Sequence, residues 1–319
     1  MLMIQPPATS LFEPVWDRYG LRLALVFGNQ AAGGLCPYYA ASRCHHCDIG
    51  AGEGRAFQNE DNLGRLEWFQ ARYAAVLPEV AHLVLYNSGS TLNPRELAPE
   101  VLEAALGWAR GLPKLTLVSL DSREAFITPE AVESACRACG RELHPILGLE
   151  SADDHVRNEL LAKKMSPEGI RRAFRTVGGV AVRGWRVGVD VNVVIGGPGT
   201  SFRSAVQDAV ATARYALELG REAGVRVDLN LHPYYPSRRG RDRFPEHGRC
   251  PLSLVFRVLE ALDALRKGEA PDTGLFLGWQ DEGHDQDQDT RSLELSIAGR
   301  AFSAFNRTQD ALALQVALG

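Results

Sequence analysis

The sequence predicts an α/β protein with a partial, curled (βα)6 barrel at its centre. Six short apolar segments, rich in Val and Leu, have the composition of parallel strands that are covered on both faces. Amphipathic segments separate them, and helical crossovers of this kind place consecutive strands in one parallel sheet. An open sheet of two halves is the alternative, but a barrel suits the order of the elements better. The predicted strands are residues 21–27, 82–86, 114–120, 143–149, 187–195 and 225–231.

The connections between these strands carry helix-start patterns. Thr128 and Ser166 each place a capping hydroxyl immediately before a proline, which is the usual arrangement at the first turn of a helix. Asn93 precedes a proline in the same way. Because Ser166 lies inside the fourth connection, that connection is expected to contain two helices. The predicted helical segments are residues 61–77, 94–110, 129–139, 153–177 and 201–223.

Two flanking segments complete the predicted organisation. Residues 1–20 are expected to form a short N-terminal arm, residues 21–250 the barrel, and residues 251–319 a C-terminal α extension. The extension contains an acidic loop at residues 281–289, which offers oxygen ligands for a cation or a cationic substrate. A solvated loop with no ligand is the alternative.

The composition is typical of a globular cytoplasmic protein. Hydrophobic residues make up 45% of the chain and charged residues 23%. The formal net charge of −4 argues against a dedicated nucleic-acid binder. The first ten residues lack the features of a secretory signal, and no apolar run is long enough to span a membrane. In a reducing compartment, the six cysteines are expected to be metal ligands or buried thiols.

Chemistry in such barrels lies in the loops at the carboxyl ends of the strands. Cys36, Cys44 and Cys47 lie just after the first predicted strand, with seven residues in the first gap and two in the second. Three thiolates can hold three irons of a 4Fe–4S cluster and leave the fourth iron open. A structural zinc site is the alternative, since His45 or His46 can supply the fourth ligand that zinc needs.

The Cys-x7-Cys-x2-Cys pattern resembles the radical SAM superfamily, whose best-known members have three residues in the first gap. The longer gap is similar to that of the archaeosine-synthase radical SAM subunit and of the Elongator catalytic-subunit radical SAM domain. The resemblance extends to residues 88–96 (SGSTLNPRE) and 148–157 (GLESADDHVR), and more weakly to residues 121–127 (DSREAFI). Together these matches cover about residues 30–250.

This resemblance implies a 4Fe–4S cluster and S-adenosylmethionine (SAM) as cofactors, with an electron donor such as flavodoxin or ferredoxin. It also implies cofactor contacts by position at the strand ends. The expected contacts are Asn87, Ser88, Gly89 and Ser90 for the methionine part, Glu150 and Ser151 for the ribose, Gly196 and Gly197 for the adenine, and His46 where relatives carry an aromatic residue. Ordinary turn formation is the alternative for the glycines and serines, and helix capping fits Ser151 better than it fits Glu150.

An arginine-rich segment follows the sixth predicted strand. Five arginines and two acids lie between residues 238 and 249, which favours an anion-binding loop because guanidinium groups pair with carboxylates and phosphates. Tyr234, Tyr235, Arg238 and Arg239 are therefore candidate substrate contacts. A solvated charged loop with packed tyrosines is the alternative.

The other candidate residues have simpler interpretations. Lys163 and Lys164 are in the region where relatives have a basic residue near the cofactor, but an exposed helix end is favoured. Cys136, Cys139 and Cys250 raise the idea of a second cluster, but buried thiols are favoured because the helix at 129–139 is expected on the outer wall of the barrel.

Three functions remain in view at this stage. The first is a radical SAM enzyme that abstracts hydrogen from a small, amino-acid-like substrate, and the acidic balance favours it. The second is a tRNA-modifying radical SAM enzyme, favoured by the arginine-rich segment. The third is a zinc-stabilised binding protein without catalysis. Rearrangement, bond cleavage, epimerisation and coupling are all open outcomes, with a lyase favoured by analogy alone.

Overall fold

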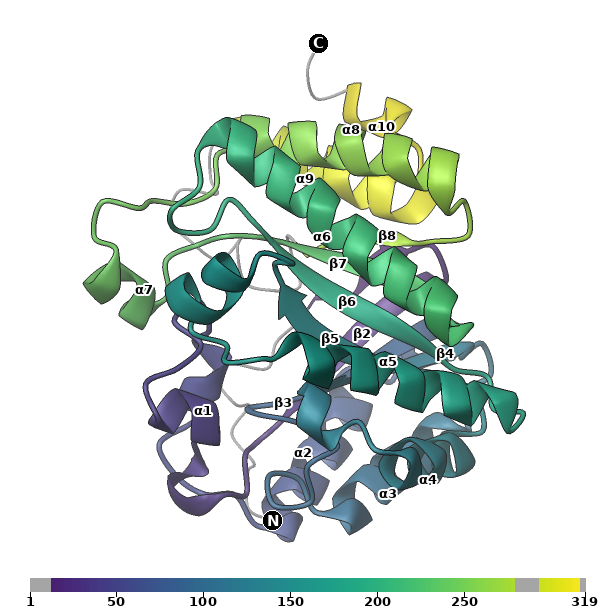
Figure 1. Ribbon diagram of the computed structural model, residues 1–319. Coiled ribbons are helices and arrows are strands. Elements are labelled where there is room, and N and C mark those ends of the chain that lie inside the picture. The colour runs from purple at the N-terminus through teal and green to yellow at the C-terminus, as the bar shows by residue number, and fades with distance from the viewer. Residues whose placement is uncertain (1–12, 279–292, 316–319) are drawn as a thin grey trace.

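The computed structural model describes residues 13–278 and 293–315. One eight-stranded sheet forms its centre, with the strands in sequential order and helices along its outer side (Figure 1). The six predicted strands correspond to β2–β7, and each is parallel to the next. The strands are β1 (Val15–Asp17), β2 (Gly20–Phe27), β3 (Val80–Asn87), β4 (Leu117–Ser122), β5 (Glu142–Glu150), β6 (Gly188–Ile195), β7 (Arg226–Pro233) and β8 (Leu275–Leu277). The predicted partial α/β barrel is confirmed.

Helices connect the strands and cover the outer face of the sheet. A short π-helix, Val156–Leu160, precedes α5, so the fourth connection does contain two helical segments. The α-helices are α1 (Pro37–Ala40), α2 (Asn59–Arg72), α3 (Pro99–Ala109), α4 (Pro129–Cys139), α5 (Pro167–Val182), α6 (Phe202–Ala223), α7 (Arg238–Arg243), α8 (Leu252–Glu269), α9 (Leu293–Thr308) and α10 (Leu312–Gln315).

Two of the three predicted helix starts are confirmed. Thr128 accepts a hydrogen bond from the backbone N–H of Ala131, and Ser166 accepts one from Gly169. The prediction that a helix begins after Asn93 is wrong, because α3 begins five residues later at Pro99. The Asn93 side chain instead donates to the Glu96 carboxylate, which holds this segment in a turn.

Both edges of the sheet come from the flanking segments. β1 is antiparallel to β2, and β8 is parallel to β7. Side chains span the opening between the first and last strands of the sheet. The Arg22 guanidinium of β2, the neighbour of edge strand β1, lies 3.9 Å from the centre of the Phe276 ring of β8. The barrel is therefore nearly closed. The proposed boundaries at residues 20 and 250 stay a prediction.

The apolar core divides into two layers because strand side chains alternate between faces. Leu23, Leu25 and Phe27 of β2 belong to the large cluster that also contains helix residues. Ala24 and Val26 belong to a small second cluster with residues of β3 and β5. Each fully buried Leu or Phe contributes about 1.5–3 kcal/mol to stability, so the outer layer supplies most of the apolar driving force. In the described residues, no helix has the length and hydropathy needed to cross a bilayer.

Candidate functional site

The three predicted cluster cysteines lie in the loop after β2, at the carboxyl end of the barrel strands. All three thiols are free and half-buried. Burial raises the pKa of Cys36, and the neighbouring Cys44 raises it further. Burial also raises the pKa of Cys47 to about 12, and Cys44 and Cys36 add to this effect. The three sulfurs therefore repel one another as thiolates, and a cationic metal centre would relieve that repulsion.

The backbone of this cysteine loop is tightly folded. A Cβ on Gly34 would lie 1.7 Å from the Arg55 carbonyl oxygen, and one on Gly52 would lie 2.0 Å from the Gly34 oxygen. Only glycine permits this close approach of the two arms of the loop. Ser42 and Cys44 adopt positive φ angles of 55° and 54°, which costs roughly 1–2 kcal/mol for each non-glycine residue. Strain of this kind is characteristic of functional sites.

Two other segments hold the cysteine loop in place. The backbone N–H groups of Cys44 and His45 donate to the carbonyls of Ala162 and Leu161, at 3.2 and 3.0 Å. From α7, the Ser237 hydroxyl donates to the His45 carbonyl oxygen. In Figure 1, α7 lies on the same side of the molecule as α1, although about 200 residues separate them along the chain.

Two of the four candidate substrate contacts, Arg239 and Tyr234, instead pack against neighbouring side chains. Arg239 lies 3.6 Å from the centre of the Tyr39 ring and donates to the Tyr39 carbonyl oxygen. Tyr234 is 4% exposed and packs edge-on against His247. Arg238 is exposed and Tyr235 is half-buried. The substrate contacts stay a prediction, and the geometry favours Arg238 and Tyr235 over the other two.

Glu150, a candidate ribose contact at the end of β5, lies among basic side chains. The Lys163 ammonium donates to it at 2.8 Å, and His46 Nε2 lies 3.5 Å from the same oxygen. Burial raises the pKa of Glu150, but Lys163 and His46 outweigh that effect and leave it below its ordinary value. In turn, the Glu150 carboxylate raises the pKa of Lys163 despite the burial of that ammonium group. The expectation that Lys163 is an exposed helix end is therefore wrong, whereas Lys164 is exposed as expected.

The turn after β3 contains the predicted methionine-binding residues. The Glu96 carboxylate accepts hydrogen bonds from the Ser90 backbone N–H and the Asn29 amide, each at 3.1 Å. A Cβ on Gly89 would lie 1.8 Å from Glu96 Oε2, so glycine lets the turn close over this carboxylate. Asn87 is 1% exposed, and its side-chain oxygen has no hydrogen-bond partner in the described part of the chain. That oxygen is a buried acceptor available for a bound ammonium group. The backbone of Ser88 continues the strand pairing by donating to Phe27.

Two other predicted cofactor residues have structural partners. The Ser151 hydroxyl donates to Asp208 of α6 at 2.7 Å and accepts from the Asp153 N–H, as the capping alternative expects. Gly196 has φ 70°, and a Cβ there would lie 2.9 Å from Leu254. Gly197 follows it in the same turn. Their role at adenine stays a prediction.

The remaining cysteines do not join the triad. Cys136 and Cys139 are buried on α4, and Cys250 is buried near Gly196. Burial raises the pKa of Cys136 and of Cys250 to about 12 each. The prediction of buried thiols is confirmed. The acidic loop at residues 281–289 lies outside the described residues.

Sequence reasoning missed two residues at this end of the barrel. Glu96 organises the turn after β3, and Arg123, just after β4, contacts the cysteine loop. Both residues lie in the segments that resemble the radical SAM superfamily, Glu96 in residues 88–96 and Arg123 in residues 121–127. That resemblance is the one sequence signal that could have indicated them.

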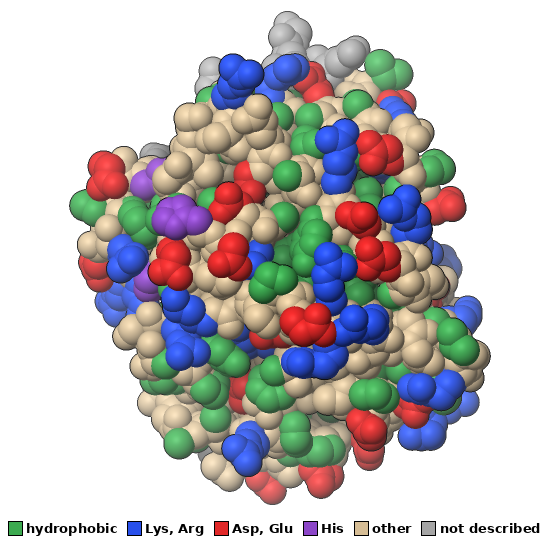
Figure 2. All heavy atoms as spheres, in the orientation of Figure 1, with side chains coloured by type: hydrophobic (Ala, Val, Ile, Leu, Met, Phe, Trp, Pro, Cys, Tyr) green, Lys and Arg blue, Asp and Glu red, His purple; other side chains and the backbone are tan. Residues whose placement is uncertain are grey.

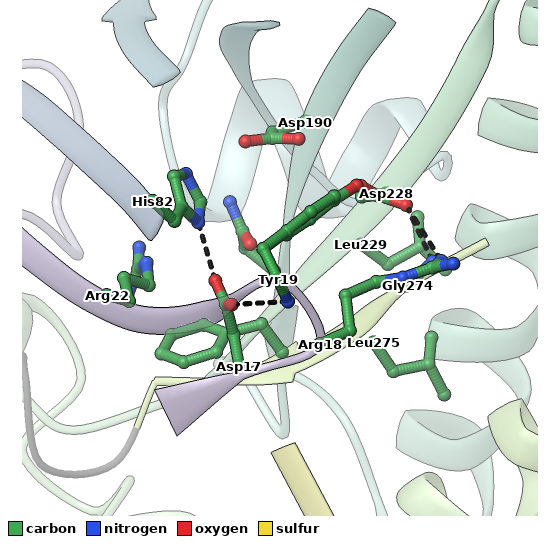
Figure 3. Close-up of a pocket in the computed structure, with 12 residues that line it drawn as sticks. Asp17, Arg18, Tyr19, Arg22, His82, Asp190, Asp228, Leu229, Gly274 and Leu275 are labelled. Atoms are coloured by element: carbon green, nitrogen blue, oxygen red, sulfur yellow. Dashed lines mark hydrogen bonds and ion pairs between the residues drawn. The ribbon is translucent and has the colours of Figure 1, made fainter. Parts of the chain in front are cut away.

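A second polar cluster occupies the opposite, amino end of the barrel (Figure 3). Ser119 links two parts of it, since its hydroxyl accepts from His82 at 2.8 Å and donates to Asp190 at 2.6 Å. His144 lies 2.7 Å from Asp190, and one ligand atom from each of His144, Asp190 and Asp228 lies within 4.8 Å of the others. These atoms already have partners, because the Gly274 N–H and the Tyr19 hydroxyl both donate to Asp228. The side chains of this cluster therefore form a hydrogen-bonded network at the amino end of the barrel.

The visible surface does not carry one sign of charge. On the face shown in Figure 2, basic and acidic side chains are interspersed. Exposed ion pairs such as Arg171 with Glu222 occur on the surface of the described chain. This arrangement is typical of a protein without a broad nucleic-acid footprint on that face.

Comparisons with known proteins give partial structural likenesses only. No protein-family model matches the chain, and no curated protein matches it. The chain is similar to queuine lyase from Clostridium spiroforme bound to SAM and queuine, with 14% identity and a TM-score of 0.46 over 72% of this chain and 83% of that one. It is also similar to the radical SAM methyltransferase TsrM from Kitasatospora setae (13% identity, TM-score 0.43, 72% and 38% of the two chains). A third similar structure is archaeal Elp3 from Methanocaldococcus infernus (11% identity, TM-score 0.46, 76% and 54%). The chain thus spans about half or less of the second and third proteins.

Proposed function

We propose that this chain is a radical SAM enzyme that binds a 4Fe–4S cluster through Cys36, Cys44 and Cys47. The observation that carries the proposal is the grouping of three free, mutually interacting thiols in one strained loop at the carboxyl end of the barrel. A zinc site is less well supported, because His45 turns both ring nitrogens toward backbone carbonyls and His46 places Nε2 against Glu150, which leaves only His46 Nδ1 as a candidate histidine ligand. Three sulfurs suit a 4Fe–4S cluster with one open iron, whereas zinc would need His46 Nδ1 as its fourth ligand.

The residues around the cysteine loop fit SAM as the second cofactor. Held by Cys36, Cys44 and Cys47, the cluster would supply the electron that cleaves SAM to methionine and a 5′-deoxyadenosyl radical able to abstract hydrogen from the substrate. The buried Asn87 side-chain oxygen accepts a hydrogen bond from the SAM ammonium, and the turn through Ser90 shapes that subsite. The Glu150 carboxylate accepts hydrogen bonds from the ribose hydroxyls, and Lys163 keeps it ionised for that purpose. A flavodoxin or ferredoxin supplies the electron to the cluster.

We propose a small, amino-acid-like molecule as the first candidate substrate. The net charge of −4 and the mixed charges of the surface support it. Modification of tRNA is the second candidate, because Arg238, Arg241, Arg243 and Arg249 are all exposed in or after α7, and the Arg238 N–H donates to Asp48 next to Cys47. Binding of tRNA that weakens steeply with salt would favour this second candidate, since each phosphate contact adds to the salt dependence.

The deciding experiment is anaerobic reconstitution with iron and sulfide, followed by reduction in the presence of SAM. We expect about four irons and four sulfides per chain, and mass spectrometry should detect 5′-deoxyadenosine only when reductant is present. Purified anoxic protein that holds one zinc and takes up no iron would contradict the proposal. A reconstituted cluster that releases no 5′-deoxyadenosine would contradict the SAM half of it.

A further inference from the structure

Arg123 is a buried cation that touches the cysteine loop at two points. Its Nη1 donates to the Cys44 sulfur at 3.7 Å, and its guanidinium carbon lies 3.6 Å from the centre of the Tyr38 ring. Its other terminal nitrogen donates to the Lys163 carbonyl oxygen at 2.6 Å. The side chain is only 11% exposed. Three contacts on different elements therefore hold the guanidinium in one orientation, with one N–H directed at a sulfur.

The position of Arg123 is also fixed from its backbone. It follows β4 directly, and its N–H donates to the Ser90 hydroxyl of the turn after β3 at 3.3 Å. The residue thus connects three structures: the cysteine loop, the turn after β3 and the segment that contains Lys163. A side chain anchored in this way cannot move away from the sulfur without breaking several contacts.

The positive charge of Arg123 is incompletely neutralised. Its nearest acid is Glu124, whose Oε2 lies 3.6 Å from Arg123 Nε. That separation is longer than a hydrogen bond, and both atoms are buried without a hydrogen-bond partner among the described residues. Lys163 adds a second buried cation nearby, but its ammonium is paired with Glu150. Because burial weakens screening, the Arg123 charge acts on Cys44 as well as on Glu124.

We propose that Arg123 sets the reduction potential of the cluster by donating a charge-assisted hydrogen bond to the Cys44 sulfur. Hydrogen bonds to the sulfurs and nearby charge are the means by which proteins adjust cluster potentials. Reduction adds one negative charge to the cluster, and the fixed cation stabilises the reduced form more than the oxidised form. Glu124 opposes this effect from the other side of the guanidinium. The inference rests on the proposed function, because it requires a cluster on the cysteine triad.

The test is a redox titration of the reconstituted protein without SAM, followed by electron paramagnetic resonance. We expect Arg123→Gln to make reduction at least tenfold less favourable, which is a downward shift of about 59 mV for one electron. Arg123→Lys keeps the positive charge but loses the planar guanidinium group. Its reduction potential should lie between those of Arg123→Gln and the wild type. Glu124→Gln should shift the potential upward, because it removes the opposing charge.

Arg239→Gln is the matched control. Arg239 also stacks on a tyrosine of the cysteine loop and bonds a loop carbonyl, but its contacts in the described chain include no cysteine sulfur. A shift in Arg239→Gln as large as that in Arg123→Gln would overturn the inference, since general loss of charge or loop packing would then explain both.

The outcomes separate this inference from the proposed function. If the wild-type protein forms no 4Fe–4S cluster, the proposed function fails and the inference fails with it. If the wild type and the variants form equal amounts of cluster at unchanged potentials, the inference alone fails. Should Arg123→Gln not retain a cluster, Glu124→Gln decides: an upward shift supports the inference, and an unchanged potential overturns it.

Discussion

The two ends of the barrel pair their buried histidines differently, because both ring nitrogens of His144 have carboxylate partners whereas Nδ1 of His46 has no hydrogen-bond partner among the described residues. At the amino end, His144 is fully buried, and its ring nitrogens contact Asp190 at 2.7 Å and Glu142 at 3.1 Å. At the carboxyl end, polar atoms of His46, Asn87, Arg123 and Glu124 are buried without a hydrogen-bond partner in the described chain. The guanidinium Nε atoms of Arg141 and Arg226 near the amino end also lack such a partner among the described residues. Unsatisfied buried groups are costly, so the carboxyl-end atoms, which lie around the cysteine loop, are candidates for ligand contacts.

The backbone shows the same contrast. Cys44, Glu150, Ala162 and Lys164 all have positive φ angles, and all lie around the cysteine loop and its supporting segment. The described residues of the amino-end network show no such angle outside glycine. The comparison supports a division between a hydrogen-bonded network at the amino end and the proposed active site at the carboxyl end. The predictions below test that division.

The largest expected effect is at the triad. Cys44→Ser should lose the cluster and lower SAM cleavage to background, because a hydroxyl does not replace a thiolate as an iron ligand. Iron content and 5′-deoxyadenosine release measure this. Cys136→Ser is the matched control on α4, where the thiol is equally free but contacts no residue of the triad, and it should retain both. Normal turnover by Cys44→Ser would mean that the triad does not hold the cluster.

The next effect is on stability and involves the amino end. Asp190→Asn should lower the free energy of unfolding by about 3–5 kcal/mol, because it leaves a charged His144 buried beside a neutral partner. Urea unfolding of the cluster-free protein measures it. The folded variant should still take up iron as the wild type does. A variant of normal stability that fails to bind iron would reverse the proposed division between the two ends.

The amino end also predicts a dependence of stability on pH. Burial lowers the pKa of His144, but Asp190 and Glu142 outweigh it and raise that pKa to about 9. A raised histidine pKa stabilises the folded protein fully below the unfolded value of about 6.5. That stabilisation is lost as pH rises through about 9, with a total loss of about 3 kcal/mol. Urea unfolding at pH 6 and pH 9 measures it, and His144→Gln should remove most of the difference.

The smallest effect concerns the cofactor pocket. Glu150→Gln should weaken SAM binding by about 1.5–3 kcal/mol, because it replaces a charged acceptor by a neutral amide. Equilibrium dialysis with reconstituted protein measures this loss, with iron content as the check on the cluster. Glu159→Gln is the control, since Glu159 forms an exposed pair with Lys164 and exposed pairs contribute about 0–1 kcal/mol. Equal affinity in Glu150→Gln and the wild type would remove Glu150 from the proposed ribose contact.

Part of this architecture followed from local sequence patterns. The six strands β2–β7 were predictable because each is a continuous apolar run between helical segments. The edge strands β1 and β8 were not, because three residues are too few to show a period of two. The start of α3 was missed because Asn93 is drawn to Glu96 instead of capping a helix. In that case a second local contact, between residues three apart in the same turn, replaced the expected cap.

The sequence by itself determined the six central strands, the cysteine spacing and the caps at Thr128 and Ser166, because each depends on residues close together in the chain. Only the tertiary structure placed Arg123 against Cys44, 79 residues away, and buried Lys163 beside Glu150. A side chain's partner across the barrel depends on strand register and loop path, and neither leaves a periodic trace in the sequence. The electrostatics of the site is therefore a product of folding.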